Sequence, residues 1–453
     1  MYLKNKRVLV LGLGVSGLST VKALHSLGAH IVVSDKKTEE ELVSFFQDIG
    51  EIYLEKHLAT DNIDLEEVDL IVKSPGIPPS NPILFKANSR NIEIITDIEL
   101  AYRISKTENI VAITGTNGKT TTTALVAEIF KEANYKTHVS GNIGVGILWD
   151  MINSDKDDFF IVEASSFQLE NTIHFKPKVS LITNISPDHL DWHGSINNYI
   201  EAKKKIFINQ DQGDFTVLNY EDEKLREMGK DINSNLIWFS SSRILDRGVY
   251  KNENNIVIND GKDEKAVIPC NELKLPGKHN LENVLGGVAI AWVMGVELEY
   301  IRRVLKRFQG VEHRIEFVRN INGRSFYNDS KGTNPDSTTR AIEAIEEPII
   351  LIAGGYDKGV EFDGLIASFR GKVKGLILLG QTKNKIREAA LRSEFENIHL
   401  VESMEEAVNL SYKLALGGDN ILLSPACASW GMYKDFEERG IDFKRLVHDL
   451  EVK

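Results

Sequence analysis

The sequence Thr114-Gly-Thr-Asn-Gly-Lys-Thr120 lies between an apolar, strand-like run and a helix-forming stretch at 121–133. A strand, a glycine-containing turn and a helix in this order are typical of a phosphate-binding loop. The glycines permit a phosphate to approach the backbone, Lys119 can bridge the β- and γ-phosphates, and the Thr120 hydroxyl can ligate Mg²⁺. Ile113 replaces the first glycine of the common motif, whose core is otherwise kept. We therefore expect an ATP site in an α/β domain.

A second glycine pattern stands upstream of this loop. Residues 8–27 predict a strand, a turn and a helix, with a G-x-G-x-x-G formed by Gly12, Gly14 and Gly17. Asp35 ends the next strand-like run, about 20 residues further on, where an acidic side chain can reach a ribose hydroxyl. NAD is the obvious ligand of such a Rossmann-like site. The pattern requires only that backbone N–H groups and a helix N-terminus face a phosphate, so the nucleotide stays open.

A third α/β block follows residue 310. Its strand-like runs lead into three loops rich in Lys, Thr, Ser and Asp, at 328–334, 354–358 and 424–430. Loops at the carboxyl ends of strands form the ligand crevice of an open α/β sheet. We therefore expect a further ligand site in this block.

Composition bounds the class of protein. The chain has 453 residues with a net charge of −12 and 42% hydrophobic residues, which predicts two to four ordinary domains. The acidic balance argues against nucleic acid as a partner, and no apolar run approaches the roughly 20 residues of a membrane span. Two cysteines cannot form a disulfide framework, which fits the reducing cytoplasm. We expect a cytoplasmic protein without membrane insertion.

Several polar residues outside the loops are ambiguous when taken singly. Glu163 ends a predicted strand, as a metal-ligating carboxylate beside a phosphate loop would, but glutamates in that position are more often solvated. The segment Asp188-His189-Leu-Asp191-Trp-His193 favours a hard ion held by oxygen and one imidazole over zinc. Three consecutive lysines at 203–205 read, by themselves, as a solvated cationic face.

Taken together, these motifs resemble the Mur ligase superfamily over essentially the whole chain. The resemblance is carried by the phosphate loop with its departure at Ile113, by Glu163, by Asp188-His189 with the lysine helix, and by His313-Arg314. The motifs at 328–334 and 423–430, followed by Asp435-Phe436 and Arg439-Gly440, are similar to those of the D-glutamate-adding branch. The folylpolyglutamate synthases share the middle and last domains but lack the first block, which argues against them.

The resemblance implies an α/β fold of three domains. These are a Rossmann-like UDP-substrate domain at 1–97, a central phosphate-loop ATPase domain with a mainly parallel sheet at 98–309, and a Rossmann-like amino-acid domain at 310–453. It implies an ATP-dependent ligase that adds D-glutamate to UDP-N-acetylmuramoyl-L-alanine through an acyl phosphate, giving ADP and phosphate, in peptidoglycan precursor synthesis. It also implies that the first glycine loop binds UDP-sugar and not NAD, that two Mg²⁺ ions are used, and that the chain acts as a monomer.

The resemblance also assigns residues. The catalytic set is Lys119, Glu163, His189 and a carbamylated Lys203, while Lys204 and Lys205 are expected at the surface. One Mg²⁺ is assigned to Thr120 and Glu163, the other to His189 and the Lys203 carbamate. ATP is assigned to Gly115, Thr116, Asn117, Gly118, Lys119, Thr120, Thr121, Asn280, Asn283, Arg314 and Asp329. The UDP substrate is assigned to Val15, Ser16, Asp35, Lys36, Ser74, Gly76 and Asn142, and D-glutamate to Lys331, Thr333, Lys358, Ser429 and Phe436.

Two other functions stay open from the residues. One is a nucleotide-sensing module that binds NAD at the first loop and ATP at the second, without turnover. The other is a related ligase for a different amino acid, since no physical feature of the sequence selects a D over an L amino acid.

Overall fold

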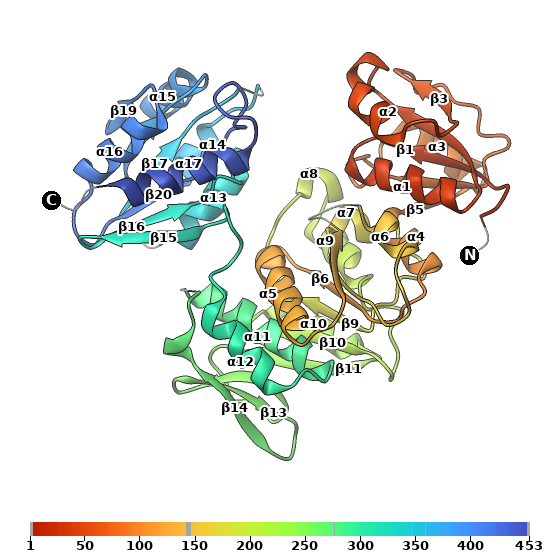
Figure 1. The fold of residues 1–453 in the computed structure, drawn as a ribbon, viewed down its shortest axis with the longest axis horizontal. Helices are drawn as coiled ribbons and strands as arrows, with labels where there is room; N and C mark the ends of the chain where they lie inside the picture. Colours follow the sequence, from red (N-terminus) through yellow and green to blue (C-terminus); the bar gives the residue numbers. More distant parts are fainter. Residues whose placement is uncertain (1–2, 142–145, 276, 346, 358, 451–453) are drawn as a thin grey trace. The chain divides into compact units, whose positions relative to one another are not determined.

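Strand, turn and helix recur along the chain as the sequence predicts, and they build three mainly parallel sheets (Figure 1). The structure is a computed structural model that describes residues 3–141, 146–275, 277–345, 347–357 and 359–450. It divides into two units, Met1–Phe308 and Gln309–Lys453. The first two sheets belong to the first unit and the third sheet to the second, which confirms the predicted α/β class.

The first sheet is entirely parallel, with the strand order β3-β2-β1-β4-β5. Its strands are β1 (Arg7–Leu11), β2 (His30–Asp35), β3 (Glu55–Leu58), β4 (Leu70–Lys73) and β5 (Glu93–Thr96). Its helices are α1 (Val15–Ser26), α2 (Val43–Ile49) and α3 (Pro82–Ser89). The change of direction at β1 places the carboxyl ends of β1 and β4 at a crevice, where open α/β sheets bind ligands.

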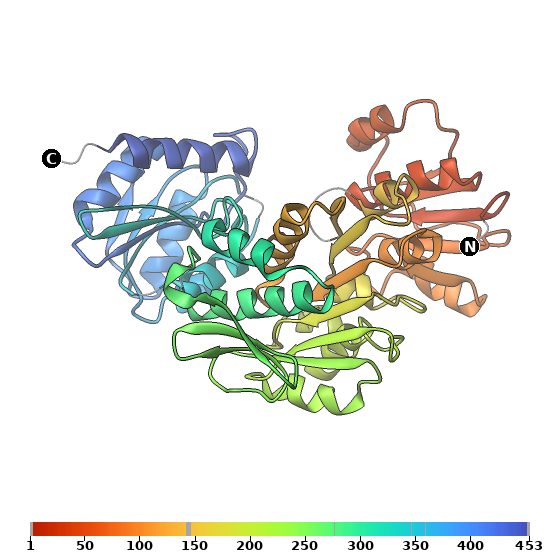
Figure 2. The same ribbon diagram turned by 60° about the horizontal axis from the view of Figure 1, so that its bottom comes forward.

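The second sheet has nine strands in the order β14-β13-β12-β11-β10-β9-β6-β8-β7, antiparallel only at β12-β13-β14. Its strands are β6 (Ile110–Thr114), β7 (Thr137–Gly141), β8 (Phe159–Glu163), β9 (Val179–Ile182), β10 (Phe215–Asn219), β11 (Asn235–Ser240), β12 (Gly248–Asn252), β13 (Asn255–Asn259) and β14 (Glu264–Pro269). Its helices are α4 (Asp97–Ile104), α5 (Lys119–Glu132), α6 (Ile147–Ile152), α7 (Ser166–Leu169), α8 (Leu190–His193), α9 (Ile196–Lys204), α10 (Glu223–Met228), α11 (Lys278–Val293) and α12 (Leu298–Arg307). Helices α11 and α12 pack beside each other, and α12 contacts β14 (Figure 2).

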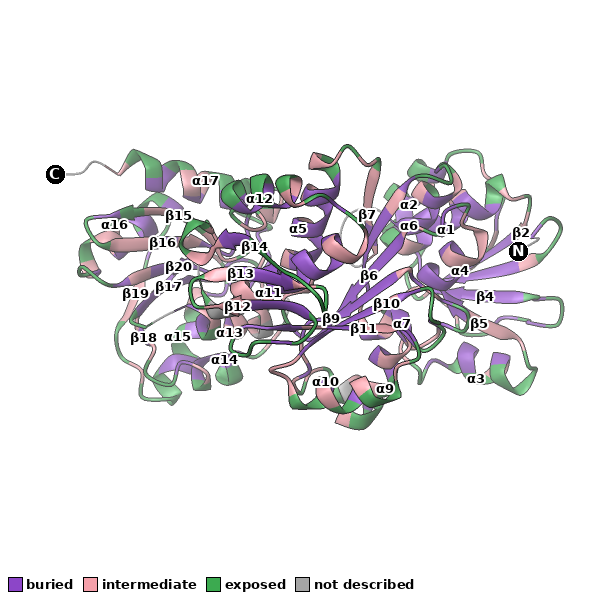
Figure 3. Cartoon of the chain, turned by 90° about the horizontal axis from the view of Figure 1, so that it is seen from below, coloured by how far each residue is buried: buried purple, intermediate pink, exposed green. Residues whose placement is uncertain are grey.

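One apolar core joins the first two sheets. It runs from Val8 and Val33 in the first sheet, through Ile98 on α4 and Leu148 on α6, to Phe160 on β8. A second core lies under α5, α11 and α12, and Figure 3 shows the buried strands between the partly exposed helices. Because the first core is continuous, the glycine loop after β1 and the phosphate loop after β6 belong to one packed unit.

Helix α4 carries a buried, charge-assisted contact near this junction. The Glu99 carboxylate is completely buried and accepts hydrogen bonds from the backbone N–H groups of Ile173, His174 and Phe175, each at 2.9 Å. The Arg103 Nε atom donates to the same carboxylate at 2.6 Å. Charge-assisted bonds of this kind are about twice as strong as neutral ones, so Glu99 fixes the loop that precedes β9.

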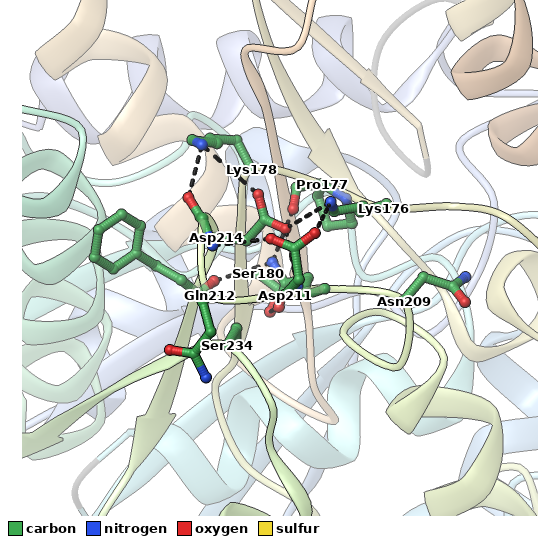
Figure 4. Close-up of polar contacts among 12 residues, drawn as sticks. Lys176, Pro177, Lys178, Ser180, Asn209, Asp211, Gln212, Asp214 and Ser234 are labelled. Carbon is green, nitrogen blue, oxygen red and sulfur yellow. Dashed lines mark hydrogen bonds and ion pairs between the residues drawn. The ribbon is translucent and has the colours of Figure 1, made fainter.

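Lysines and aspartates hold the amino ends of β9 and β10 together (Figure 4). The phosphate loop lies at the opposite, carboxyl ends of the strands. The Lys176 Nζ atom lies 2.6 Å from Asp211 and 3.2 Å from Asp214, and Lys178 lies 3.7 Å from Asp214. These contacts raise the pKa of Lys176. Because the lysines are partly exposed, we interpret the cluster as a structural contact between the two strands and not as a ligand-binding site.

The second unit has the strand order β15-β16-β20-β17-β18-β19, with only β15 antiparallel. Its strands are β15 (Glu316–Ile321), β16 (Arg324–Asn328), β17 (Ile349–Ala353), β18 (Val373–Leu378), β19 (Ile398–Leu400) and β20 (Asn420–Leu423). Its helices are α13 (Pro335–Ala344), α14 (Asp363–Ala367), α15 (Lys383–Arg392), α16 (Met404–Leu414) and α17 (Phe436–Asp449). Apolar cores cover both faces of this sheet. Since β16, β20 and β17 are adjacent and parallel, the loops after them lie together at the carboxyl ends of the strands.

Within the described residues, no helix combines the length and apolar character that crossing a membrane requires. The boundaries after residues 97 and 309 stay predictions.

Candidate active site

The phosphate loop has the local geometry that its sequence predicts. Strand β6 is fully buried, and α5 begins at Lys119 with Gly118 as its N-cap in the left-handed region, at φ 82°. A Cβ atom on Gly115 would lie 1.9 Å from the Thr183 Oγ1 atom, so only glycine fits there. Thr183 and Asn184, which follow β9, hold the loop. Both side chains donate to the Asn117 carbonyl oxygen, and the Asn184 Oδ1 atom accepts from the Asn117 N–H. The N-terminus of α5 is thus presented to an anion.

Two residues of α11 lie against this loop. A Cβ atom on Gly118 would lie 2.0 Å from the Asn283 Oδ1 atom, which shows how closely Asn283 covers the loop. The Asn283 side chain also donates to Asn280 at 3.3 Å. The Lys119 Nζ atom donates to the Gly115 and Thr116 carbonyl oxygens at 2.9 and 2.8 Å. Of the assigned ATP residues in the first unit, Gly115, Thr116, Asn117, Gly118, Lys119, Thr120, Thr121, Asn280 and Asn283 therefore lie on or beside one loop.

Lys203 is not a solvated side chain, and the interpretation of 203–205 as a cationic face is wrong for it. Only 1% of Lys203 is exposed, and its Nζ atom donates to Thr114 Oγ1 at 3.1 Å and to the Gly115 carbonyl at 2.8 Å. The amine also lies 4.7 Å from the centre of the Tyr199 ring. The helix α9 therefore delivers the lysine to the phosphate loop.

The two following lysines differ from each other. Lys204 is 24% exposed and lies 2.9 Å from Glu201, as expected of a surface residue. Lys205 is partly buried, donates to the Glu170 carbonyl oxygen, and has its pKa lowered by burial. Lys205 has the same intermediate exposure as Lys204, but α9 ends at Lys204 and the turn brings the Lys205 amine back to the end of α7.

The oxygen donors expected to hold Mg²⁺ are buried near this loop. Glu163, the last residue of β8, is 1% exposed and pairs in register with Ile113, and Thr120 is 3% exposed. A carboxylate and a hydroxyl beside a phosphate loop fit Mg²⁺, which takes few protein ligands and completes its shell with phosphate oxygens and water. Among the described residues, no three His, Cys, Asp or Glu side chains gather into a metal centre of their own.

His189 is held in an unusual backbone conformation. Its φ and ψ angles are 52° and 36°, in the left-handed region that costs non-glycine residues about 1–2 kcal/mol. Its ring lies 4.8 Å from that of Phe167, and its Nε2 atom lies 3.6 Å from the Asp188 carboxylate. Such strain persists only where surrounding contacts over-determine it, which is common at functional sites.

The first glycine loop is equally constrained. A Cβ atom on Gly17 would lie 2.3 Å from the Gly12 carbonyl oxygen, whereas one on Gly14 would meet nothing within 4 Å. The Asp35 carboxylate accepts from the Leu13 N–H at 2.7 Å and from the Lys37 N–H at 3.0 Å. Asp35 therefore shapes the loop itself, in addition to any contact with a ligand.

The other residues assigned to the UDP substrate surround this loop. Ser74 donates to the Gly12 carbonyl at 2.8 Å, and Val15 is 67% exposed at the start of α1. Ser16 follows it on the helix, Lys36 is exposed after β2, and Gly76 lies in the loop after β4. Asn142 lies outside the described residues.

In the second unit Arg314 lies on the segment before β15, and the other described residues with an assignment lie on two neighbouring loops and the start of α17. Asp329 is buried and its Oδ2 atom accepts from Ser424 Oγ at 2.6 Å, while burial raises its pKa to about 7 against the opposing effect of Arg314. The Lys331 Nζ atom lies 5.9 Å from the centre of the Phe436 ring. Thr333 and Ser429 lie on the same two loops. Lys358 lies outside the described residues.

Arg439, on α17, joins these two loops and was given no role from the sequence. Its guanidinium donates to Ser330 Oγ at 2.9 Å, to the Ser330 carbonyl at 2.8 Å and to the Cys427 carbonyl at 3.1 Å. The motif Arg439-Gly440 was visible in the sequence, but only the fold shows which loops the arginine bridges.

Three family comparisons match successive parts of the chain. The MurD-like N-terminal domain of Mur ligases matches residues 6–96, the Mur ligase middle domain residues 113–291, and the Mur ligase glutamate ligase domain residues 313–427.

Full-length relatives agree with these matches. The chain is 46% identical to the UDP-N-acetylmuramoylalanine–D-glutamate ligase of Thermoanaerobacter sp. (strain X514), over 99% of this chain and 100% of that protein. It is also 46% identical to the enzyme of the same name from Clostridioides difficile (strain 630), over 100% of both. Among solved structures, UDP-N-acetylmuramate-alanine ligase MurC from Thermotoga maritima has a TM-score of 0.56 at 20% identity, over 98% of this chain and 100% of that one. That last likeness concerns the fold alone.

Proposed function

The chain belongs to the Mur ligase family of ATP-dependent amide-forming enzymes, and we propose that it joins D-glutamate to UDP-N-acetylmuramoyl-L-alanine in peptidoglycan precursor synthesis. The observation that carries this proposal is the 46% identity, end to end, with relatives named for that reaction. The constrained glycine loop and phosphate loop in one packed unit support it, since the reaction needs a UDP-linked acid and ATP together.

The chemistry must overcome the low reactivity of a carboxylate. In the proposed sequence a carboxylate oxygen of the L-alanine residue attacks the γ-phosphorus of ATP, the bond to the leaving oxygen breaks, and ADP departs. The amine of D-glutamate then adds to the acyl carbon, and the tetrahedral intermediate expels phosphate as the amide forms. Negative charge gathers on the phosphoryl oxygens and then on the tetrahedral centre, so fixed cations and donors should supply most of the catalysis.

The residues of the first unit have distinct parts in this sequence. Ser16, Ser74 and the backbone around Gly12 would hold the UDP-linked acid, while Gly118 and Thr121 would present the N-terminus of α5 to the ATP phosphates. Lys119, which lies over Gly115 and Thr116, would turn to the transferred phosphoryl group and neutralise its charge.

Bound Mg²⁺ would neutralise phosphate oxygens, with Thr120 and Glu163 holding one ion and His189 with a carbamylated Lys203 holding another. Carbamylation converts the buried amine of Lys203 into an anionic oxygen donor beside Gly115. The burial of this lysine supports the idea, because an amine screened from water by Thr114 and Tyr199 gains from becoming an anion that faces a cation.

The second unit would supply the amino acid. Lys331, Thr333, Lys358, Ser429 and Phe436 would form a cationic pocket for the two carboxylates of D-glutamate. Arg314 and Asp329 would contact the nucleotide. We also propose that the enzyme acts in the cytoplasm as a monomer, without a nucleic-acid partner and without insertion into a membrane.

A phosphate-release assay tests the function. The full chain is incubated with ATP, Mg²⁺ and UDP-N-acetylmuramoyl-L-alanine, and a panel of D- and L-amino acids is added one at a time. Release that requires D-glutamate supports the proposal. Release with another amino acid alone assigns a related ligase, and binding of nucleotides without release assigns a sensing module.

A further inference from the structure

Lys73 is a buried lysine that no motif of the sequence identifies. It is the last residue of β4, directly before Ser74, and only 1% of it is exposed. Its Nζ atom donates to the Ile77 carbonyl oxygen at 3.1 Å. Removing a cation from water is unfavourable unless other groups compensate, so the surroundings of this amine need an explanation.

Besides the Ile77 carbonyl, the compensation comes from the central part of the unit. The Nζ atom lies 5.7 Å from the centre of the Trp192 ring, within reach of a cation–π contact. Burial lowers the pKa of Lys73 to about 8, while the carboxylates of Glu170 and Asp97 act in the opposite direction. Glu170 follows α7 and Asp97 begins α4, so the charge of Lys73 is favoured by groups of the central part in addition to the Trp192 ring.

Trp192 in turn belongs to an aromatic cluster that includes the histidine of the site. Its Nε1 atom donates to Glu170 at 3.1 Å, and its ring lies 4.4 Å from that of Phe167. Phe167 also contacts His189 at 4.8 Å and stacks on His193 at 5.7 Å with an interplanar angle of 10°. The strained backbone of His189 is therefore held through Phe167, and Phe167 is backed by Trp192.

We propose that Lys73 is a positioning residue, which holds Trp192 against Phe167 and so ties the segment 186–193, with His189, to the strand end that leads into Ser74. Lys73 thereby fixes the position of the loop after β4, which begins at Ser74, relative to His189, the histidine expected to hold a metal ion. The inference rests on the proposed function in one respect, the metal role of His189.

The test replaces Lys73 by Met, which keeps most of the aliphatic stem and removes the charge, and by Arg, which keeps a cation able to contact the Trp192 ring. Lys156→Met, at an exposed lysine of the same unit, is the matched control. Mn²⁺ binding is measured by electron paramagnetic resonance on the full chain with a non-hydrolysable ATP analogue and the UDP substrate. Tryptophan emission is recorded on the same samples, with Trp192→Phe to isolate the signal of Trp192.

One Mn²⁺ ion should be lost in His189→Ala. We expect Lys73→Met to raise the Mn²⁺ concentration that half-saturates this site by about tenfold, the size seen when a group behind a metal ligand is removed. Trp192 emission should shift in Lys73→Met, whereas Lys73→Arg and Lys156→Met should both stay close to the wild type. Should Lys73→Met fail to fold, Trp192→Leu is expected to weaken the same ion similarly. Where both fold, the double variant should be no worse than either single one.

A folded Lys73→Met protein with wild-type Mn²⁺ binding overturns the proposal, as does a His189→Ala protein that binds as many Mn²⁺ ions as the wild type. Additive effects of Lys73→Met and Trp192→Leu overturn it too. Because these measurements need no turnover, they remain informative even if the wild-type chain releases no phosphate with D-glutamate. That result would contradict the proposed function alone.

Discussion

The Nζ atom of Lys203 lies 2.8 Å from the carbonyl oxygen of Gly115, so a lysine near the end of α9 touches the first residue of the phosphate loop. These residues are 88 positions apart in the sequence. The carbamate that we propose on Lys203 would therefore stand beside the phosphate loop.

Replacing Lys203 by Ala should therefore abolish most phosphate release, and added bicarbonate should not rescue it, because no amine remains to react. Lys204→Ala, one position further on and paired with Glu201, is the control and should keep most activity. The carbamate itself is sought by ¹³C nuclear magnetic resonance after equilibration with labelled bicarbonate. An active Lys203→Ala enzyme contradicts the assignment.

The two glycines of the first loop should respond differently to a methyl group. In Gly17→Ala the new Cβ atom would meet the Gly12 carbonyl oxygen, and overpacking of this kind typically costs 1–3 kcal/mol. Gly14→Ala has open space and an ordinary φ of −79°, so its thermal midpoint should stay near that of the wild type. Thermal unfolding of both variants checks this, and equal midpoints would count against the loop geometry.

The buried Glu99 should dominate the junction of α4 with the loop before β9. Glu99→Ala leaves three backbone N–H groups and Arg103 without their shared acceptor, which should cost about 3–5 kcal/mol. Glu93→Ala removes the half-exposed second partner of Arg103 and should cost about 1 kcal/mol or less. Urea unfolding of the two variants measures the difference, and a mild Glu99→Ala would refute this role.

Asp329 should make the stability of the chain depend on pH. Burial raises its pKa from 3.8 to about 7, so the folded protein keeps a proton that the unfolded chain releases. The contribution of this carboxyl to stability is therefore present below about pH 4 and is lost as the pH rises towards 7, by at most about 1.4 kcal/mol per pH unit. Asn at position 329 has no proton to release in this range. As the pH rises from 4 to 7, the thermal midpoint of Asp329→Asn should therefore fall less than that of the wild type.

The control for that series is Asp363→Asn, which removes an exposed carboxylate from the same unit. Parallel curves of thermal midpoint against pH for the wild type and Asp329→Asn would show that the Asp329 carboxyl does not hold a proton in the folded protein.

Local patterns were enough to predict the strand, turn and helix around both loops. The strand-like run before the phosphate loop is β6, and the helix predicted from residue 121 begins two residues earlier, because Gly118 ends the turn and α5 begins at Lys119. The helix that carries the three lysines begins at Ile196, since Ser195 caps it by accepting from the Asn198 N–H. Such caps and periodic apolar faces act over a few residues, so a sequence displays them directly.

Contacts between distant segments could not be predicted in this way. Three consecutive lysines have the same pattern whether they are solvated or not, and only packing decides that Lys203 is buried against the phosphate loop while Lys204 is not. The long-range contacts of Glu99 and Lys73 have no local signal, because the backbone groups that donate to Glu99 begin 74 residues away and the Trp192 ring beside Lys73 lies on another element. The catalytic assignment of Lys203 came from the resemblance to the family and not from periodicity or spacing.

The central claim is tested most directly by identifying the product. The full chain is incubated with ATP, Mg²⁺, UDP-N-acetylmuramoyl-L-alanine and isotopically labelled D-glutamate, and the UDP-linked species are separated and analysed by mass spectrometry, with Lys119→Ala as the inactive control. We predict a UDP-linked product that carries the label, requires ATP, and is absent with L-glutamate and in Lys119→Ala. A wild-type enzyme that consumes ATP yet transfers no label from D-glutamate to the UDP-linked acid would contradict the account.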